Sequence, residues 1–275
     1  MNINFTKNLL LVATITLAAA IGFIVYQRHF APINQQIFPP TTIPLPDYDY
    51  SNIVMEVNQK NALIQSVSYT DVAVDMKNGI VDLKLNAKIE YQKPFNLNMN
   101  VKSFLGDELV MGSNNDEFWF WSKRMQPSAL HYAKHIDLNK TRLKPAFSPM
   151  IIMDSFGLAP LSPNAAYAPG AKENRIVAMT EERDTLDRPV MKMVFIDTHF
   201  KRVVGQMLTD KVGKLIASSE ILSWNGDIPT QILYHWFEED KVMLMTMNHF
   251  KINEPIDGIS WQKPKMENSI DMSKD

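Results

Sequence analysis

Short segments in which apolar and polar residues alternate, each bounded by a turn sequence, make up most of the chain after residue 48. Residues 81–89, VDLKLNAKI, are typical of a strand with one buried face, because successive side chains of a strand point to opposite sides. Asn78-Gly79, between this segment and residues 72–74, predicts a tight hairpin, since the central positions of such a turn need positive φ. Connections this short make successive strands antiparallel neighbours.

The second half of the chain repeats the pattern. Strands are expected at residues 175–182, 189–197, 202–209, 215–224, 230–237 and 241–250. Short turns such as 211–213 and 225–226 separate them. Together with the first half this gives about eleven strands in one large curved antiparallel sheet, long enough to curl into a barrel or a half-barrel. The expected fold class is therefore mainly β (α+β).

Two helices are expected beside the sheet. Residues 51–65 have a Ser that can cap a helix and apolar residues on one side. In residues 148–157, Ser at the cap, Pro at the first helical position and Gly at the end predict a short apolar helix. Residues 158–173, rich in Pro and Ala, then read as a mobile loop. The short helix lies between the two halves of the sheet, where it can act as a lid on the mouth of the barrel.

Residues 118–121, FWFW, break the alternation, because both faces of this strand are aromatic and both must therefore be covered. Trp119 and Trp121 are expected on one face and Phe118 and Phe120 on the other, with either pair lining the interior. Methionine stripes in strands 189–197 and 241–250 also indicate an apolar interior, which is either a ligand cavity or a solid core. The candidate residues of the cavity and its lid are Leu97, Met99, Phe118, Trp119, Phe120, Trp121, Met150, Ile151, Met153, Phe156, Met193, Phe195, Met243 and Met245.

The N-terminal segment indicates export. Residues 9–26 form an uncharged apolar run, with Lys7 before it and Arg28 after it, long enough to cross a bilayer. We interpret residues 1–29 as a transmembrane anchor, and the alternative is a signal peptide cleaved near residues 18–20. The five prolines of residues 30–48 predict an extended linker. The working domain is then 49–265, with a flexible tail at 266–275, and either interpretation exports it.

Several functional classes are excluded or left without support. The net charge of −2 provides no basic field for nucleic acid, and the absence of cysteine excludes disulfides, thiolate metal sites and a lipidated Cys. No metalloprotease, hydrolase or nucleotide-binding motif occurs. His131 and His135 have the spacing of a helical zinc site, but on the strand expected there they would lie roughly 13 Å apart. We therefore expect a protein that is not an enzyme and holds no metal or cofactor.

Several stretches of the chain resemble bacterial LolA/LolB-like outer-membrane lipoprotein carriers and receptors, and more closely the LolA-like exported proteins of planctomycete-type bacteria. The similar stretches are 95–123, with its GSN-D-FW-W pattern, 130–132, 227–229, 252–253 and 261–264. The resemblance implies an unclosed antiparallel β-barrel with a helical lid that holds acyl chains in an apolar cavity. Two features depart from the family: the chain has no lipobox Cys, and it carries an expected anchor.

The resemblance implies non-enzymatic binding of lipid or lipoprotein acyl chains in the bacterial cell envelope, with lipoprotein sorting to the outer membrane as the wider role. The domain would then lie in the periplasm, anchored to the inner membrane or secreted after signal cleavage. The expected partners are such acyl chains and, through the N-terminal helix, the membrane, with no nucleic acid. The alternative is a membrane-anchored interaction or scaffold protein with a solid core and no lipid ligand.

Overall fold

The computed structural model describes residues 48–78, 81–144 and 147–274. The expected anchor and almost all of the expected linker lie outside these residues. Within the described ranges, no helix is both long and apolar enough to span a membrane. Residues 49–168 and 176–275 form one compact unit, to which residues 169–175 do not belong. The sites described below lie in that unit.

Two antiparallel meanders build the sheet. The first contains β1 (Ser66–Asn78), β2 (Val81–Gln92), β3 (Asn96–Ser103), β4 (Gly106–Ser113), β5 (Glu117–Ser122) and β6 (Leu130–Lys134). The second contains β7 (Ala166–Pro169), β8 (Arg175–Arg183), β9 (Pro189–Asp197), β10 (Arg202–Asp210), β11 (Leu215–Asn225), β12 (Ile228–Trp236) and β13 (Lys241–Ile252). The pairing of β1 with β13 joins them into one sheet, in which β14 (Ser269–Asp271) lies parallel to β6.

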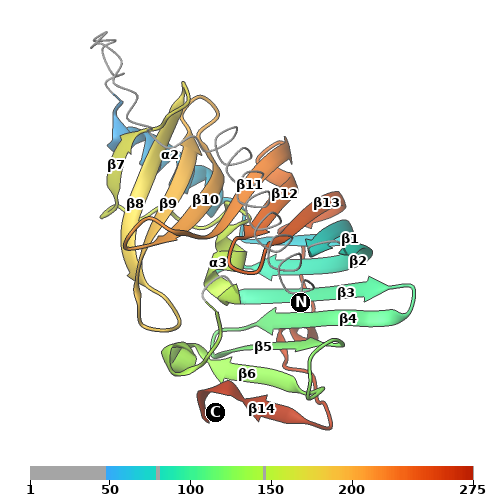
Figure 1. Cartoon of the computed structure of the whole chain (residues 1–275). Helices are drawn as coiled ribbons and strands as arrows, with labels where there is room; N and C mark the ends of the chain where they lie inside the picture. The colour runs from blue at the N-terminus through green and yellow to red at the C-terminus, as the bar shows by residue number, and fades with distance from the viewer. Residues whose placement is uncertain (1–47, 79–80, 145–146, 275) are drawn as a thin grey trace, which may run out of the picture. The chain divides into compact units, whose positions relative to one another are not determined.

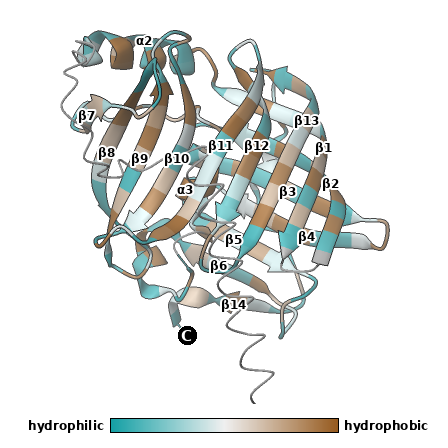
Figure 2. Cartoon of the chain, turned by 45° about the horizontal axis from the view of Figure 1, so that its top comes forward, coloured by the Kyte–Doolittle hydropathy of each residue, from teal (hydrophilic) through white to brown (hydrophobic). Residues whose placement is uncertain are grey.

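The fourteen strands follow the order β14-β6-β5-β4-β3-β2-β1-β13-β12-β11-β10-β9-β8-β7, so the sheet is open, with β14 at one end and β7 at the other (Figure 1). An unclosed, curved sheet confirms the expected fold class. The hairpin expected at Asn78 is also confirmed, since Asn78 pairs with Val81; Gly79 lies outside the described residues. Apolar and polar residues alternate along the strands (Figure 2), which separates a face that packs inward from one that faces outward.

The helices of the described residues are few and short. They are α2 (Tyr50–Ala62), α3 (Pro149–Asp154) and the 3-10 helices η1 (His135–Lys140), η3 (Gly258–Trp261) and η4 (Met272–Lys274). Asp49, not Ser51, caps α2, because its side chain accepts a hydrogen bond from the Asn52 N–H at 3.1 Å. α3 begins at Pro149 as expected, and Gly157, with φ of +69°, turns the chain away after it.

α3 packs into the interior of the sheet through the residue that follows it. The ring of Phe156 lies between those of Tyr69 on β1 and Tyr91 on β2, with centroid distances of 6.0 and 5.8 Å. On α2, the Asn61 side chain donates hydrogen bonds to the carbonyls of Gly157 and Ala159, which fixes the segment after α3. The expected lid is thus held by aromatic stacking and by hydrogen bonds from a side chain of α2 to backbone carbonyls that follow α3.

Two segments differ from expectation. β7 lies within the expected loop 158–173, and β14 and η4 lie in the expected flexible tail 266–275, where Met272 is buried. Both strands are too short, at four and three residues, for an alternating pattern to be recognised. What orders β14 is hydrogen bonding to β6, a strand more than a hundred residues away, and local sequence does not report such pairing.

Candidate functional site

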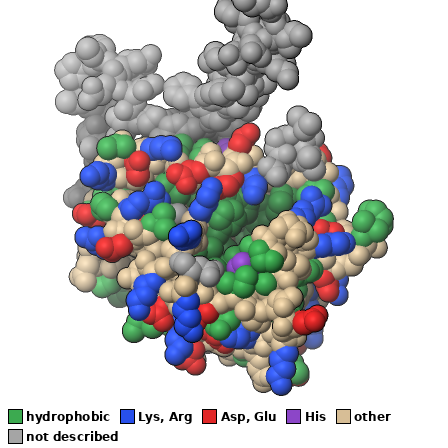
Figure 3. Space-filling view, turned by 60° about the horizontal axis from the view of Figure 1, so that its bottom comes forward, with side chains coloured by type: hydrophobic (Ala, Val, Ile, Leu, Met, Phe, Trp, Pro, Cys, Tyr) green, Lys and Arg blue, Asp and Glu red, His purple; other side chains and the backbone are tan. Residues whose placement is uncertain are grey.

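A cavity of about 330 Å³ lies inside the sheet, between β3–β5 of the first meander and β12–β13 of the second. Its surroundings are almost entirely apolar, and Figure 3 shows hydrophobic side chains gathered in a hollow on this side of the molecule. The size and lining are those of a small-molecule site. The apolar and aromatic wall residues from the strands are Met99, Leu109, Met111, Phe118, Phe120, Tyr234, Trp236, Met243 and Met245, and the polar ones are Ser122 and Lys241.

The wall from the first meander follows from strand register. Met99 on β3 lies opposite Met111 on β4, and Met111 lies opposite Phe120 on β5, so the three side chains form a row on one face. Phe118, two residues before Phe120, points to the same side. Unbranched methionine side chains adapt their shape readily, so this wall can fit chains of different outline.

The wall from the second meander has one polar end. Tyr234 on β12 lies opposite Met243 on β13, and Trp236 lies opposite Lys241. The ring of Phe147 stacks on Trp236 at 5.5 Å, and the Lys241 ammonium lies 5.9 Å from the Phe147 ring. The cavity therefore has a cation and stacked aromatic rings at one end and methionines along its length.

α3 divides this cavity from a second, more polar one. Ile152 and Ser155 line the apolar cavity, while Met150, Ile151 and Asp154 line a pocket of about 370 Å³ on the other side of the helix. That pocket also contains Glu182 and Asp184 of the β8 region and Lys192 of β9. The lid helix is thus a partition with an apolar side and a charged side.

On the charged side, Lys192 ties α3 to the sheet. Its Nζ lies 2.5 Å from Asp154 Oδ2 and 3.7 Å from Glu182 Oε1. The side chains of Lys192 and Asp154 are both largely buried. Burial lowers the pKa of Lys192, but the charges of Asp154 and Glu182 and the hydrogen bonds to them outweigh it, so the pKa is raised. The Gln206 side chain adds a 2.7 Å hydrogen bond to the Ile151 carbonyl.

Comparisons with known proteins bear on the fold. No family model and no curated protein matches the sequence. Among solved structures, a LolA superfamily protein from Nitrosomonas europaea matches with a TM-score of 0.51 at 10% identity, covering 78% of this chain and 97% of that one. The chain has a LolA-like fold. An outer membrane lipoprotein-sorting protein domain from Vibrio parahaemolyticus matches at a TM-score of 0.49 and 9% identity, covering 75% of this chain and 95% of that one. A DUF1329 family protein from Desulfovibrio piger matches with a TM-score of 0.49 at 10% identity, covering 77% of this chain and 95% of that one.

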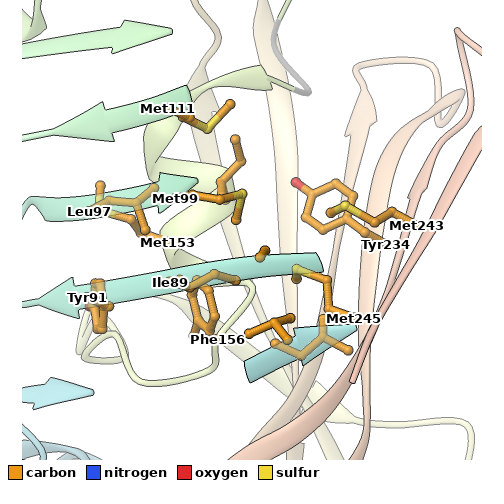
Figure 4. Packing of buried hydrophobic residues seen from close by; sticks show 14 of the residues in the cluster. Ile89, Tyr91, Leu97, Met99, Met111, Met153, Phe156, Tyr234, Met243 and Met245 are labelled. Atoms are coloured by element: carbon orange, nitrogen blue, oxygen red, sulfur yellow. The ribbon is translucent and has the colours of Figure 1, made fainter. Parts of the chain in front are cut away.

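Within this LolA-like fold, five of the residues expected from sequence line the apolar cavity together: Met99, Phe118, Phe120, Met243 and Met245. Three others, Leu97, Met153 and Phe156, are buried in the core around it (Figure 4). Met150 and Ile151 line the polar pocket on the far side of α3.

Trp119 and Trp121 were among the residues expected to line the cavity, but they lie on the other face of β5 and do not line it. The Trp119 ring crosses Gly112, where a Cβ atom would come within 2.5 Å of it, and the Trp121 indole N–H donates to Ser128 Oγ at 3.2 Å. Trp119 pairs with Tyr132, and the Lys263 ammonium lies 3.5 Å from the Tyr132 ring. The outer face of the aromatic strand is therefore covered by the C-terminal segment that carries η3.

Met193 and Phe195 were also expected to line the cavity, and they do not. On β9, Val190 and Lys192 line the polar pocket and Val194 lines a small cleft beside it, so these alternate residues face inward. Met193 and Phe195 fall between them and face outward. The methionine stripe of β9 is thus on the opposite face from the stripe of β13.

Several cavity residues were not anticipated. Met111, Tyr234 and Trp236 have mostly apolar neighbours, so alternation does not show which face they occupy. The sequence around Phe147 has no recognisable strand or helix pattern. Only the tertiary fold brings its ring onto that of Trp236.

A separate apolar feature lies at the β3–β4 turn. Phe104 is 95% exposed and Leu105 is 67% exposed. Lys123 Nζ donates to the Leu105 carbonyl at 3.4 Å, and Lys102 pairs with Asp107 at 3.2 Å. We call Phe104 and Leu105 the apolar tip; it places two large apolar side chains in water beside two ammonium groups.

Proposed function

We propose that this protein binds the acyl chains of a lipid or lipoprotein in the apolar cavity, with no chemistry of its own, on the periplasmic side of the bacterial inner membrane. The observation that carries the proposal is the cavity of about 330 Å³ walled by methionine and aromatic side chains from both meanders. A solid core would fill this space at close-packed density. The fold shared with a LolA superfamily protein supports the same function.

The energetics favour an apolar chain. Each methylene moved from water into such a cavity contributes about 0.8 kcal/mol, so a chain of moderate length gains enough to offset the cost of being immobilised. The flexible Met99, Met111, Met243 and Met245 side chains let the wall adjust to the chain. Release of the chain requires α3 to move, because Ile152 of the lid forms part of the wall.

The alternative, a membrane-anchored interaction or scaffold protein, is favoured by the exposed Phe104 and Leu105. An exposed apolar pair of this kind marks a contact with another molecule. This observation is compatible with lipid binding as well, since a carrier must deliver its ligand to a membrane or a partner. The cavity has no role in the alternative, and we therefore prefer lipid binding.

The test compares two matched variants of the full chain, purified in an amphipol. Met99→Gln places an amide of similar length in the cavity wall, and Met193→Gln makes the same change on the outward face of β9. We expect mass spectrometry to find co-purified lipid in the wild type and Met193→Gln, and much less in Met99→Gln. A fluorescent fatty acid should bind in the same order. Equal lipid content and equal binding in all three proteins would contradict the proposal.

A further inference from the structure

Tyr234 projects from β12 into the apolar cavity. Its side chain lies opposite Met243 on β13, and the residue is only 1% exposed. Figure 4 shows its hydroxyl oxygen pointing away from its own strand, toward Met99 on the other side of the interior. A polar oxygen therefore lies at the wall of a space lined mainly by apolar side chains, with Ser122, Ser155 and Lys241 as its other polar residues.

The hydroxyl has no hydrogen-bond partner among the described residues. A buried hydroxyl left unpaired is destabilising, so such groups are rare unless a ligand or water completes them. Tyr69 is the useful contrast: it is equally buried on the same sheet, but its hydroxyl donates to the Pro229 carbonyl at 3.1 Å. The protein satisfies one buried tyrosine with its own backbone and leaves the hydroxyl of the other unpaired at the cavity wall.

The Tyr234 group is a hydrogen-bond donor at any physiological pH. Burial, and to a smaller extent the negative charge of Asp154, raise the pKa of its phenol far above the ordinary value, so the proton stays on. Of the two serines that line the cavity, Ser155 Oγ already donates to the Ile152 carbonyl at 2.6 Å, and Ser122 Oγ accepts from the Arg124 N–H at 3.4 Å. Tyr234 therefore offers a proton that the lid serine does not.

We propose that Tyr234 donates a hydrogen bond to the carbonyl oxygen of an acyl group held in the cavity, which makes acyl esters and fatty acids, not plain hydrocarbons, the preferred ligand class. The proposal rests on the lipid-binding function and deepens it. An acyl chain supplies what the cavity lacks: carbon for the methionine walls and one acceptor oxygen for the phenol. A hydrocarbon would leave the hydroxyl unpaired and would therefore bind more weakly.

The experiment uses the full chain in an amphipol and two probes of the same chain length, methyl decanoate and decane. Binding is measured by equilibrium dialysis for the wild type, Tyr234→Phe and the control Tyr69→Phe. We expect Tyr234→Phe to weaken methyl decanoate about three- to tenfold, the effect of one net hydrogen bond, and to leave decane unchanged. Tyr69→Phe should change neither affinity, because its hydroxyl is committed to Pro229.

Infrared spectroscopy of carbonyl-labelled methyl decanoate gives an independent readout. The ester band should lie at lower wavenumber when bound to the wild type and Tyr69→Phe, and should return toward its position in hydrocarbon solvent in Tyr234→Phe. Thermal unfolding without ligand should show Tyr69→Phe less stable and Tyr234→Phe unchanged or more stable, because only the first loses a formed hydrogen bond.

The outcomes separate the two proposals. If both probes bind but Tyr234→Phe changes neither the ester affinity nor its band, the inference is overturned and lipid binding stands. The hydroxyl would then be paired with a water molecule in the space of about 10 Å³ that also touches Tyr234. If neither probe binds the wild type, lipid binding itself fails and the inference fails with it.

Discussion

Lys192 on β9 holds Asp154, the last residue of α3, through a contact of 2.5 Å between Nζ and Oδ2. Asp154 belongs to the lid and Lys192 to the second meander, so the pair fixes the lid to the sheet on the side away from the apolar cavity. On the same side, the Gln206 side chain donates a hydrogen bond to the Ile151 carbonyl. The charged side of the lid therefore controls how firmly its apolar side closes the cavity.

Breaking the Lys192–Asp154 pair should both destabilise the fold and loosen the lid. Lys192→Met leaves Asp154, whose side chain is 13% exposed, as a largely buried charge without its cation. We expect a loss of about 3 kcal/mol in the free energy of unfolding, measured by urea denaturation, and faster dissociation of bound lipid. The control is Lys102→Met, which breaks an exposed pair with Asp107 and should cost about 0–1 kcal/mol. Equal costs for the two variants would show that the lid pair has no special role.

The free energy of unfolding should depend on pH through Glu90 on β2. Burial raises the pKa of this carboxyl, but hydrogen bonds from Lys88, Ser260 and Asn98 and the charge of Lys88 outweigh burial and lower it below its ordinary 4.5. A lowered pKa contributes stability above the unfolded value, and this contribution is lost as the pH falls through the folded value. Glu90→Gln should therefore lower the melting temperature at pH 7, and the difference from wild type should shrink below about pH 4.5.

The measurement is thermal unfolding of both proteins between pH 7 and pH 3, with the exposed Glu254→Gln as control. Glu254 pairs with Lys251 in solvent and should give a small effect throughout. A difference for Glu90→Gln that stays constant across the range would mean that its interactions do not depend on ionisation.

The apolar tip should affect delivery and not folding. Replacing Phe104 and Leu105 by Ser changes two exposed side chains, so the free energy of unfolding should move by less than about 0.5 kcal/mol for each. Transfer of a bound fluorescent fatty acid to vesicles of phosphatidylethanolamine and phosphatidylglycerol should become slower, because the variant loses apolar area that can enter the interface. Val212→Ser, at another exposed turn, is the control and should leave transfer unchanged. Transfer at the wild-type rate would assign the tip to another role.

Much of the fold was predictable because hairpins are local. β9 has the bounds expected from residues 189–197, and the turns at Gly213 and Gly226 have the positive φ that their sequences indicate. Alternation also placed Phe118 and Phe120 on one face of β5 and Trp119 and Trp121 on the other. Each of these conclusions depends only on neighbouring residues, and a strand's period of two is fixed by its backbone.

The sequence by itself thus determined most of the strands, though not β7 or β14, together with their turns and the side chains that share a face. It did not determine which face looks inward, because the two faces of a strand are equivalent until something covers them. The stripes with Met193 on β9 and Met243 on β13 have the same pattern, yet only the second lines the cavity. Which face is buried depends on the tertiary structure: on the curvature of the sheet, on the packing of α3 against it and on the pairing of β14 with β6. These features depend on contacts between residues far apart in the chain.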